Sequence, residues 1–198
     1  MTQAESHKKI IEAIHERRSV RSYSPQRLEA ATIRSLLDAA VWAPTAVHEE
    51  PWAFVIVQDR ALLQHLSDRA KKIFSAEADQ AHPEQARHLL DMLANPDFNI
   101  FYDAGTLIVI CARPKGAFVT ADCWLAAENL LLAAHSMGLG SCVIGFAVPA
   151  LNTPEIKADL GIPPECTAVA PIIVGVPSGA TPRTTRKEPE ILAWKSAG

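Results

Sequence analysis

The spacing of hydrophobic positions predicts several amphipathic helices. Apolar residues at 33, 36, 37, 40 and 41 recur every three to four positions, which is typical of one face of a helix. This stripe predicts a helix over about 28–42, and Pro44 ends it because a proline disfavours helical geometry in the residue before it. The same reasoning predicts four further helices, over about 10–18, 60–74, 120–137 and 154–160.

Short runs rich in β-branched and aromatic residues lie between these helices. They predict buried strands at 52–57, 106–111, 142–146 and 168–176. Strands that alternate with an excess of helices indicate a layered α+β or α/β fold. A length of 198 residues suits one domain, and no repeat or Gly/Ser linker divides the chain. We therefore expect a single domain over residues 1–198.

The predicted helix over 120–137 is apolar on nearly every side, with Trp124, Leu125 and a run of leucines and alanines. Such a helix must be covered on all sides, which one domain of this size rarely achieves alone. The pattern therefore predicts a homodimer in which a second copy supplies part of the cover.

Residues 75–102 differ in character from the rest of the chain. The stretch is rich in Ala, Glu, Asp, His and Gln and is interrupted by Pro83 and Pro96. It predicts short surface helices, which form either a lid or an ordinary solvated excursion. The sequence leaves both interpretations open.

The composition excludes several classes of protein. Hydrophobic residues make up 48% and charged residues 21%, as in soluble globular proteins and unlike disordered chains. No apolar stretch approaches the roughly 20 residues that span a bilayer, and the polar N-terminus does not resemble a secretory signal. With a net charge of −3 and scattered basic residues, we expect no nucleic-acid or membrane partner and a cytoplasmic location. The four cysteines form no CxxC pair, so we expect reduced thiols and no metal site.

Two stretches in the first third of the chain carry candidate chemistry. Three arginines and a serine lie within residues 17–21, and their planar paired donors suit a phosphate. They equally suit the negative end of the helix dipole at a helix C-terminus. Residues 43–52 combine two prolines with small side chains, and this turn could lie against a flat aromatic ligand or simply join a helix to a strand.

Two further stretches lie in the second half. The glycines of residues 138–146 let backbone N–H groups approach a ligand, although a Gly-Leu-Gly turn also serves as a helix cap. This turn does not match the dinucleotide pattern GxGxxG. Residues 183–187 are Arg-Thr-Thr-Arg-Lys, which as an isolated charge cluster would be a solvated tail.

Taken in this order, the four stretches resemble the motifs of the nitroreductase family of flavin mononucleotide (FMN) enzymes. The family's Arg-[Arg/His]-Ser-x-[Arg/Lys] resembles residues 17–21, and its Ala-Pro-Ser-Ser-x-Asn-x-Gln-Pro-Trp resembles residues 43–52. Its Gly-Leu-Gly-x-x-x-x-Gly-Phe after a long helix matches residues 138–146, and its closing basic pair resembles residues 186–187. The resemblance covers about residues 10–190.

Apart from Thr45 in place of the first serine, the second motif departs from the family's pattern at three positions. Ala46 replaces a serine, His48 stands at the usual asparagine and Glu50 at the usual glutamine. A histidine keeps a hydrogen-bonding group for the flavin. A glutamate pointing inward would oppose negative charge on a reduced flavin, so we expect Glu50 to pair with an arginine or to turn away.

The resemblance implies an α+β fold: a three-layer α/β/α sandwich with a mixed, mainly antiparallel sheet and a long buried central helix. It further implies a domain-swapped homodimer that binds FMN at its interface, with residues 180–198 reaching the partner subunit. Carried over by position, the phosphate contacts are Arg17, Ser19, Arg186 and Lys187, Arg21 lies at the pyrimidine edge, and Arg18 is a further cofactor-binding residue. The remaining flavin contacts are Pro44, Thr45 and Ala46 of the partner subunit, together with His48 and the backbone amides of Ile144 and Gly145.

The activity that the resemblance implies is a ping-pong reaction. NAD(P)H reduces the flavin and leaves, and then a nitroaromatic, a quinone or a similar small acceptor takes the electrons. Because the flavin carries the chemistry, no catalytic side chain is expected. Two alternatives stay open: a flavin-binding sensor or reservoir with little turnover, and a family variant that performs flavin fragmentation or reductive dehalogenation.

Overall fold

A four-stranded sheet forms the centre of the molecule. The computed structural model describes residues 10–78, 91–114 and 116–196. The strands are β1 (Trp52–Val57), β2 (Thr106–Ala112), β3 (Gly140–Val143) and β4 (Thr167–Gly175), in the spatial order β1-β2-β4-β3. All three neighbouring pairs are antiparallel, and a register shift interrupts the β2–β4 pair between Ile110 and Cys111.

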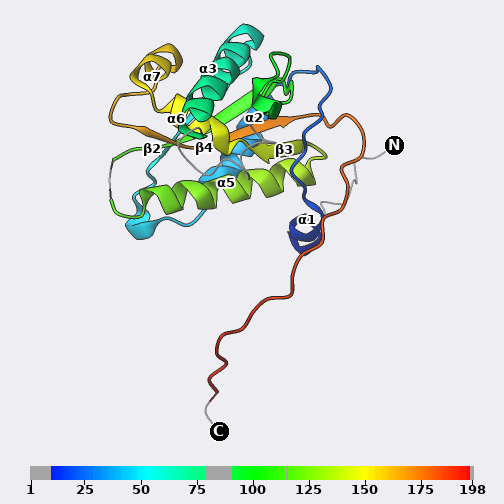
Figure 1. The fold of residues 1–198 in the computed structure, drawn as a ribbon. Coiled ribbons are helices and arrows are strands. Elements are labelled where there is room, and N and C mark those ends of the chain that lie inside the picture. The colour runs from blue at the N-terminus through cyan, green and yellow to red at the C-terminus, as the bar shows by residue number, and fades with distance from the viewer. Residues whose placement is uncertain (1–9, 79–90, 115, 197–198) are drawn as a thin grey trace.

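Helices cover both faces of this sheet (Figure 1). One face carries α2 (Ala30–Val41) and α5 (Val119–Ser136), and the other carries α3 (Arg60–Ala78), α6 (Val148–Leu151) and α7 (Pro154–Leu160). Alternate residues of β2 point to opposite faces, so Leu107 and Val109 join one hydrophobic cluster and Ile108 and Ile110 join the other. The predicted α+β three-layer sandwich is confirmed.

The N-terminal segment runs beside the edge strand β3. Helix α1 (Ile10–Glu16) packs against α5, and the chain then passes along β3, where the Val20 amide donates to the Ser141 carbonyl at 3.0 Å. A single parallel bridge joins Ser19 to Ser141. This bridge supplies a parallel pairing at the edge of a sheet whose four strands pair antiparallel.

Several helices and strands begin or end at other residues than the sequence predicts. The strand predicted over 142–146 is wrong at both ends: β3 starts at Gly140 and ends at Val143, because residues 145–147 turn into the short helix η2 (Gly145–Ala147). Gly138, at a φ of 75°, follows the end of α5 as predicted. Helix α1 ends two residues early, and α3 continues four residues past the predicted end.

Only part of the predicted lid falls within the described residues. Residues 75–78 are the last turn of α3, residues 91–94 are helical, and residues 79–90 lie outside the described ranges. The buried ammonium of Lys71 donates to the carbonyls of residues 95, 96 and 98, and Ile100 and Phe101 are buried. Residues 95–101 are therefore fixed to α3 and to the core.

A single chain covers only one side of α5. Its inner face is fully buried, but the side chains of Trp124 and Leu125 are 42% and 46% exposed. No helix in the described part of the chain is both long and apolar enough to cross a lipid bilayer.

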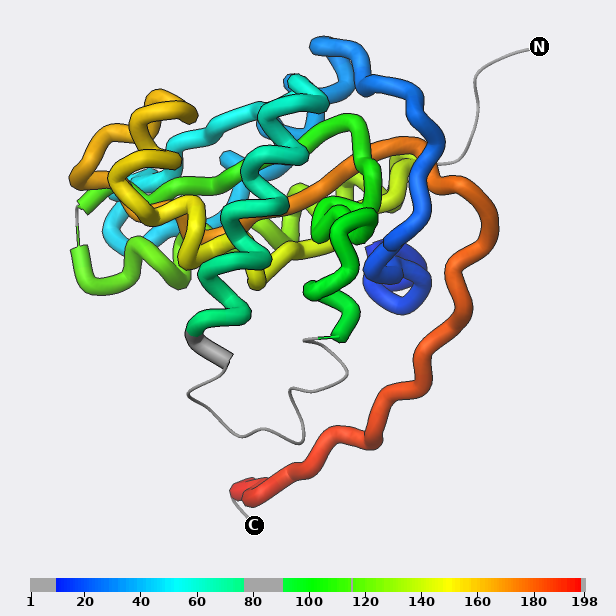
Figure 2. Tube along the Cα trace, turned by 45° about the horizontal axis from the view of Figure 1, so that its top comes forward, coloured from blue at the N-terminus to red at the C-terminus, as the bar shows by residue number. Residues whose placement is uncertain are grey.

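The C-terminal tail leaves the body as an extended chain. Its first residues pair with the N-terminal segment: Ser24 and Ser178 donate backbone hydrogen bonds to Val176 and Ser22, and Tyr23 forms a bridge with Pro177. Figure 2 shows the tail passing α1 and continuing away from the sheet. Leu192 and Trp194 are 90% and 82% exposed near its end.

Candidate functional site

The N-terminal segment and the tail enclose a cavity of about 360 Å³. Its lining residues are Arg17, Arg18, Ser19, Arg21, Thr181, Pro182, Thr184 and Arg186. Arginines from opposite ends of the chain therefore meet around one space. The local cause is the backbone pairing of residues 22–24 with residues 176–178, which holds the two segments side by side.

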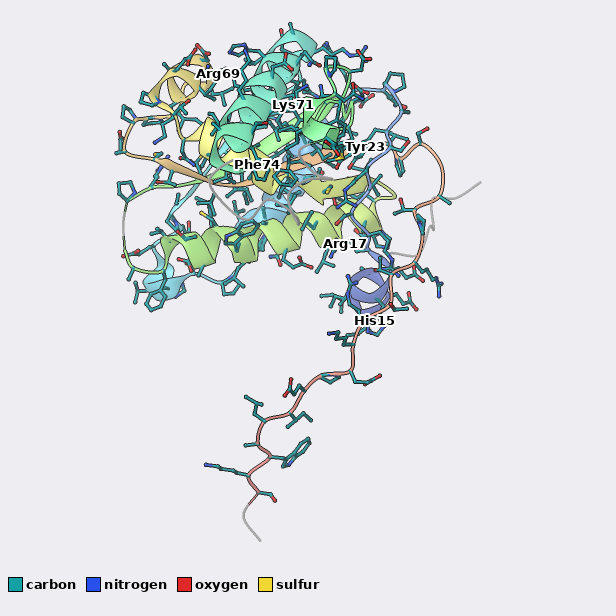
Figure 3. The ribbon with its side chains drawn as sticks, viewed as in Figure 1. His15, Arg17, Tyr23, Arg69, Lys71 and Phe74 are labelled. Atoms are coloured by element: carbon teal, nitrogen blue, oxygen red, sulfur yellow. The ribbon has the colours of Figure 1, made fainter. Side chains whose placement is uncertain are left out.

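Arg17 and Arg18 both carry unpaired buried donors at this cavity. Figure 3 shows Arg17 between α1 and α5, where its Nε lies 3.9 Å from Glu128 Oε1, an ion-pair distance too long for a hydrogen bond. The Nε atoms of Arg17 and Arg18 are buried without a hydrogen-bond partner among the described residues. Buried donors normally find acceptors, so a ligand or a second subunit that reaches these two atoms would satisfy them.

Arg18 also caps α1. Its Nη1 donates to the carbonyls of His15 and Arg17, each at 2.6 Å, as expected for a cation at a helix C-terminus. Arg186 is held within the tail by a 2.9 Å hydrogen bond from Nη1 to Thr184 Oγ1. Lys187 is exposed and does not line the cavity.

Arg21 lies between the cavity and an aromatic pair. Its guanidinium carbon is 5.9 Å from the centre of the Tyr102 ring, which packs edge-on against Phe98. Beside it, burial raises the pKa of the Cys142 thiol, although Arg21 and a hydrogen bond with Ser19 partly offset the shift. The thiol is therefore neutral at physiological pH, and the arginines provide the charge at this position.

Two of the three glycines of the third motif, Gly140 and Gly145, have different surroundings. A Cβ atom at Gly145 would meet no atom within 4 Å, and its φ lies outside the left-handed region. A Cβ atom at Gly140 would lie 2.8 Å from the Val20 side chain, so close packing against the N-terminal segment requires glycine there. Gly145 is thus exposed to open space, while the neighbouring Ile144 is buried.

The turn over residues 44–48 lies at the opposite end of α5 from the arginine cavity. Within it the short helix η1 (Ala46–His48) contacts the first turn of α5, where the Ala46 amide donates to Asp122 Oδ1 at 3.3 Å. A second cavity, which shares Arg17 with the first, is lined by His135 in the last turn of α5. Asp122 and His135 are separated by about 20 Å along the helix axis.

One chain therefore does not bring all the predicted cofactor contacts together. Arg17, Arg18, Ser19, Arg21 and Arg186 meet at one cavity, whereas Pro44, Thr45, Ala46 and His48 lie near the far end of α5. His48 and Glu50 are exposed, with φ angles of 57° and 46°.

Sequence reasoning missed two features of the site. Thr181, Pro182 and Thr184 line the cavity, and the only available signal was their proximity to the basic cluster. Asp122 is buried beside the 44–48 turn, and its signal was an acid near the start of a mostly apolar segment. Within the described ranges no group of three or more metal-binding side chains occurs.

Comparison with known proteins places the chain in a family. Residues 14–176 match the family model described as the nitroreductase family. The chain belongs to the nitroreductase family. A provisionally named NADH dehydrogenase/NAD(P)H nitroreductase of Archaeoglobus fulgidus is 31% identical over 84% of each chain. An iodotyrosine deiodinase of Thermotoga neapolitana is 23% identical over 91% of this chain and 95% of its own.

The fold of this nitroreductase family member also matches solved structures. A nitroreductase from Bacteroides fragilis with bound FMN aligns with a TM-score of 0.80 and 28% identity. The alignment covers 94% of this chain and 99% of the other.

Proposed function

We propose that this nitroreductase family member is an FMN-dependent oxidoreductase that transfers electrons from NAD(P)H to small acceptors such as nitroaromatics or quinones. The observation that carries the proposal is the meeting of Arg17, Arg21 and Arg186 around one cavity. FMN in the related Bacteroides structure and the NAD(P)H name of the Archaeoglobus relative support this assignment.

The cavity suits the phosphate end of the cofactor. Arg17 and Arg186 carry the charge that a dianionic phosphate needs, and the Ser19 hydroxyl adds a neutral donor. Lys187 follows Arg186 in the exposed tail and joins the phosphate contacts if the tail moves closer on binding. The backbone amides of Ile144 and Gly145 lie directly after the end of β3.

When bound, FMN supplies the redox chemistry by accepting and returning a hydride equivalent. The residues of the chain orient the ring and stabilise charge. Arg21, fixed beside Tyr102, is a permanent cation that lowers the energy of added negative charge on the ring. The open space at Gly145 allows the ring to approach the backbone closely.

The same proposal requires a homodimer. The 44–48 turn lies near the far end of α5 from the arginines, so the turn that completes each site comes from the partner subunit. The exposed side chains of Trp124 and Leu125 on α5, and of Leu192 and Trp194 in the tail, supply apolar surface for the second copy. The four free cysteines, all buried, suit the reducing cytoplasm that we propose as its location.

The purified protein tests this proposal directly. We expect a yellow dimer whose flavin absorbance bleaches anaerobically with NADH or NADPH and returns when a nitroaromatic or quinone is added. A colourless protein that does not bind added FMN would refute the assignment. A yellow protein that neither pyridine nucleotide reduces would instead indicate a flavin sensor or reservoir.

A second candidate function is reductive dehalogenation, and the similarity to the Thermotoga iodotyrosine deiodinase favours it. Iodide release from 3-iodotyrosine, measured with the chemically reduced protein, separates this activity from nitroreduction. Reduction of nitroaromatics without iodide release would exclude the deiodinase alternative.

A further inference from the structure

Asp122 is a buried carboxylate with one unpaired oxygen. It lies in the first turn of α5 and is 3% exposed. Its Oδ1 accepts the hydrogen bond from the Ala46 amide at 3.3 Å, but its Oδ2 has no hydrogen-bond partner in the described residues. The positive end of the α5 dipole favours the negative charge without pairing this oxygen. Because a buried polar atom is costly when unpaired, a missing donor is the physical explanation.

The backbone turn that Asp122 contacts is strained. Val47, His48 and Glu50 have φ angles of 48°, 57° and 46°, in the left-handed region that residues other than glycine rarely occupy. For a β-branched residue such as Val47 this conformation is exceptional. Strained backbone persists only where the surroundings hold it in place, and it is found most often at ligand sites.

Backbone hydrogen bonds and one side-chain contact with α5 hold this turn in its strained form. The Glu49 amide donates to the Ala46 carbonyl at 3.1 Å, and the Arg113 amide donates to the Pro51 carbonyl at 2.8 Å. The hydrogen bond to Asp122 ties the start of the turn to α5, 76 residues further along the chain. Asp122 therefore connects the central helix to the element that the proposed function assigns to the cofactor site of the partner subunit.

We propose that Asp122 is a positioning residue for the flavin site. Its Oδ1 fixes the 44–48 turn and the strained residues that follow it, through the Ala46 amide. Its Oδ2 accepts a hydrogen bond from an N–H or O–H donor that is in place only when the flavin is bound. The inference rests on the proposed function, because the turn acts on the flavin of a partner subunit. It adds a buried acceptor that no family motif in the sequence identified.

Two substitutions separate the roles of the two oxygens. Asp122→Asn keeps one acceptor for the Ala46 amide but places an NH₂ group where Oδ2 stood, so a donor meets a donor. Asp122→Ala removes both acceptors. Asp38→Asn is the matched control, because Asp38 is an exposed aspartate on α2 in the same layer.

The full-length protein is measured with and without FMN, by fluorescence titration of the cofactor and by amide hydrogen exchange. We expect Asp122→Asn to weaken FMN binding at least tenfold while the exchange of residues 46–50 stays within twofold of wild type. Loss of a negative charge alone would favour an anionic ligand, so weaker binding cannot arise from charge. Asp122→Ala should weaken binding at least as much and accelerate exchange of the turn at least tenfold, and Asp38→Asn should change neither.

Two results would overturn the inference. FMN binding by Asp122→Asn within threefold of wild type would show that Oδ2 receives no donor from the bound state. Unchanged exchange of residues 46–50 in a folded Asp122→Ala protein would show that the carboxylate does not hold the turn. If wild-type protein binds no FMN, the proposed function fails, yet exchange in the flavin-free Asp122→Ala variant still tests the anchoring role. Thermal melts of each variant identify any that does not fold.

Discussion

Removal of Arg17 and Arg186 tests the proposed phosphate site most directly. The Arg17 side chain is 21% exposed and Arg186 is exposed. A hydrogen bond to a charged group contributes about 1.5–3 kcal/mol, and an exposed ion pair contributes about 1 kcal/mol or less. We therefore expect Arg17→Ala to weaken FMN binding roughly 10- to 150-fold, and Arg186→Ala up to about fivefold.

The assay is fluorescence titration of FMN into flavin-free protein, with the double variant and two controls. Arg183→Ala removes a cation from the same tail at a position that does not line the cavity, so binding should not change. Glu128→Gln removes the carboxylate 3.9 Å from Arg17 Nε and should leave binding unchanged or tighten it. An affinity of the folded Arg17→Ala/Arg186→Ala variant within threefold of wild type would refute the assignment of this cavity to the phosphate.

Three further predictions concern cysteines, glycines and the outer face of α5. Burial raises the pKa of Cys111 to about 11 and that of Cys123 to about 12, above the usual value near 9. The buried neutral thiols make their full contribution to the free energy of unfolding below pH 9, and this contribution is lost as pH rises towards 12. Urea unfolding should therefore show stability falling over that range. The fall should be less steep in the Cys111→Ala variant, which has one buried thiol fewer. Gly140→Ala should lower the melting temperature because of its 2.8 Å contact, whereas Gly145→Ala should melt like wild type and bind FMN more weakly. Leu125→Asp should shift size-exclusion elution towards the monomer and reduce FMN binding in parallel, and a flavin-loaded monomer would contradict the shared site.

The elements that the sequence predicted well are those with a local physical cause. The apolar stripe of α2 and the β-branched runs of β1 and β2 gave correct elements, because burial of a face depends on residue spacing alone. The end of α5 two residues before Gly138 follows from the left-handed backbone that glycine adopts readily. The strand near Ser141 was misplaced, because its start depends on close packing of Gly140 against the N-terminal segment, which is a tertiary contact.

The residues of the candidate site show the same difference between local signals and tertiary contacts. Arg17 and Arg186 were paired only because the order of four motifs resembled a family, since neither basic cluster by itself distinguishes a phosphate contact from a helix cap or a tail. The helix-cap interpretation in fact also applies to Arg18, whose guanidinium donates to the end of α1. Asp122 has no partner at a recognisable spacing, so only the folded chain shows its contact with Ala46.

The length of α5 links these observations to the proposed assembly. In a twofold dimer, every contact between a residue of one copy and a residue of the other occurs twice. If two α5 helices pack antiparallel about a twofold axis near the middle of the helix, with the exposed Trp124 and Leu125 within the contact, the first turn of one helix lies near the last turn of the other. The 44–48 turn of one copy then comes close to the arginine cavity of its partner, so each site takes its charge from one subunit and its strained turn from the other. In the proposed dimer, the separation of about 20 Å between the two ends of α5 would let a symmetric pair complete two sites at once.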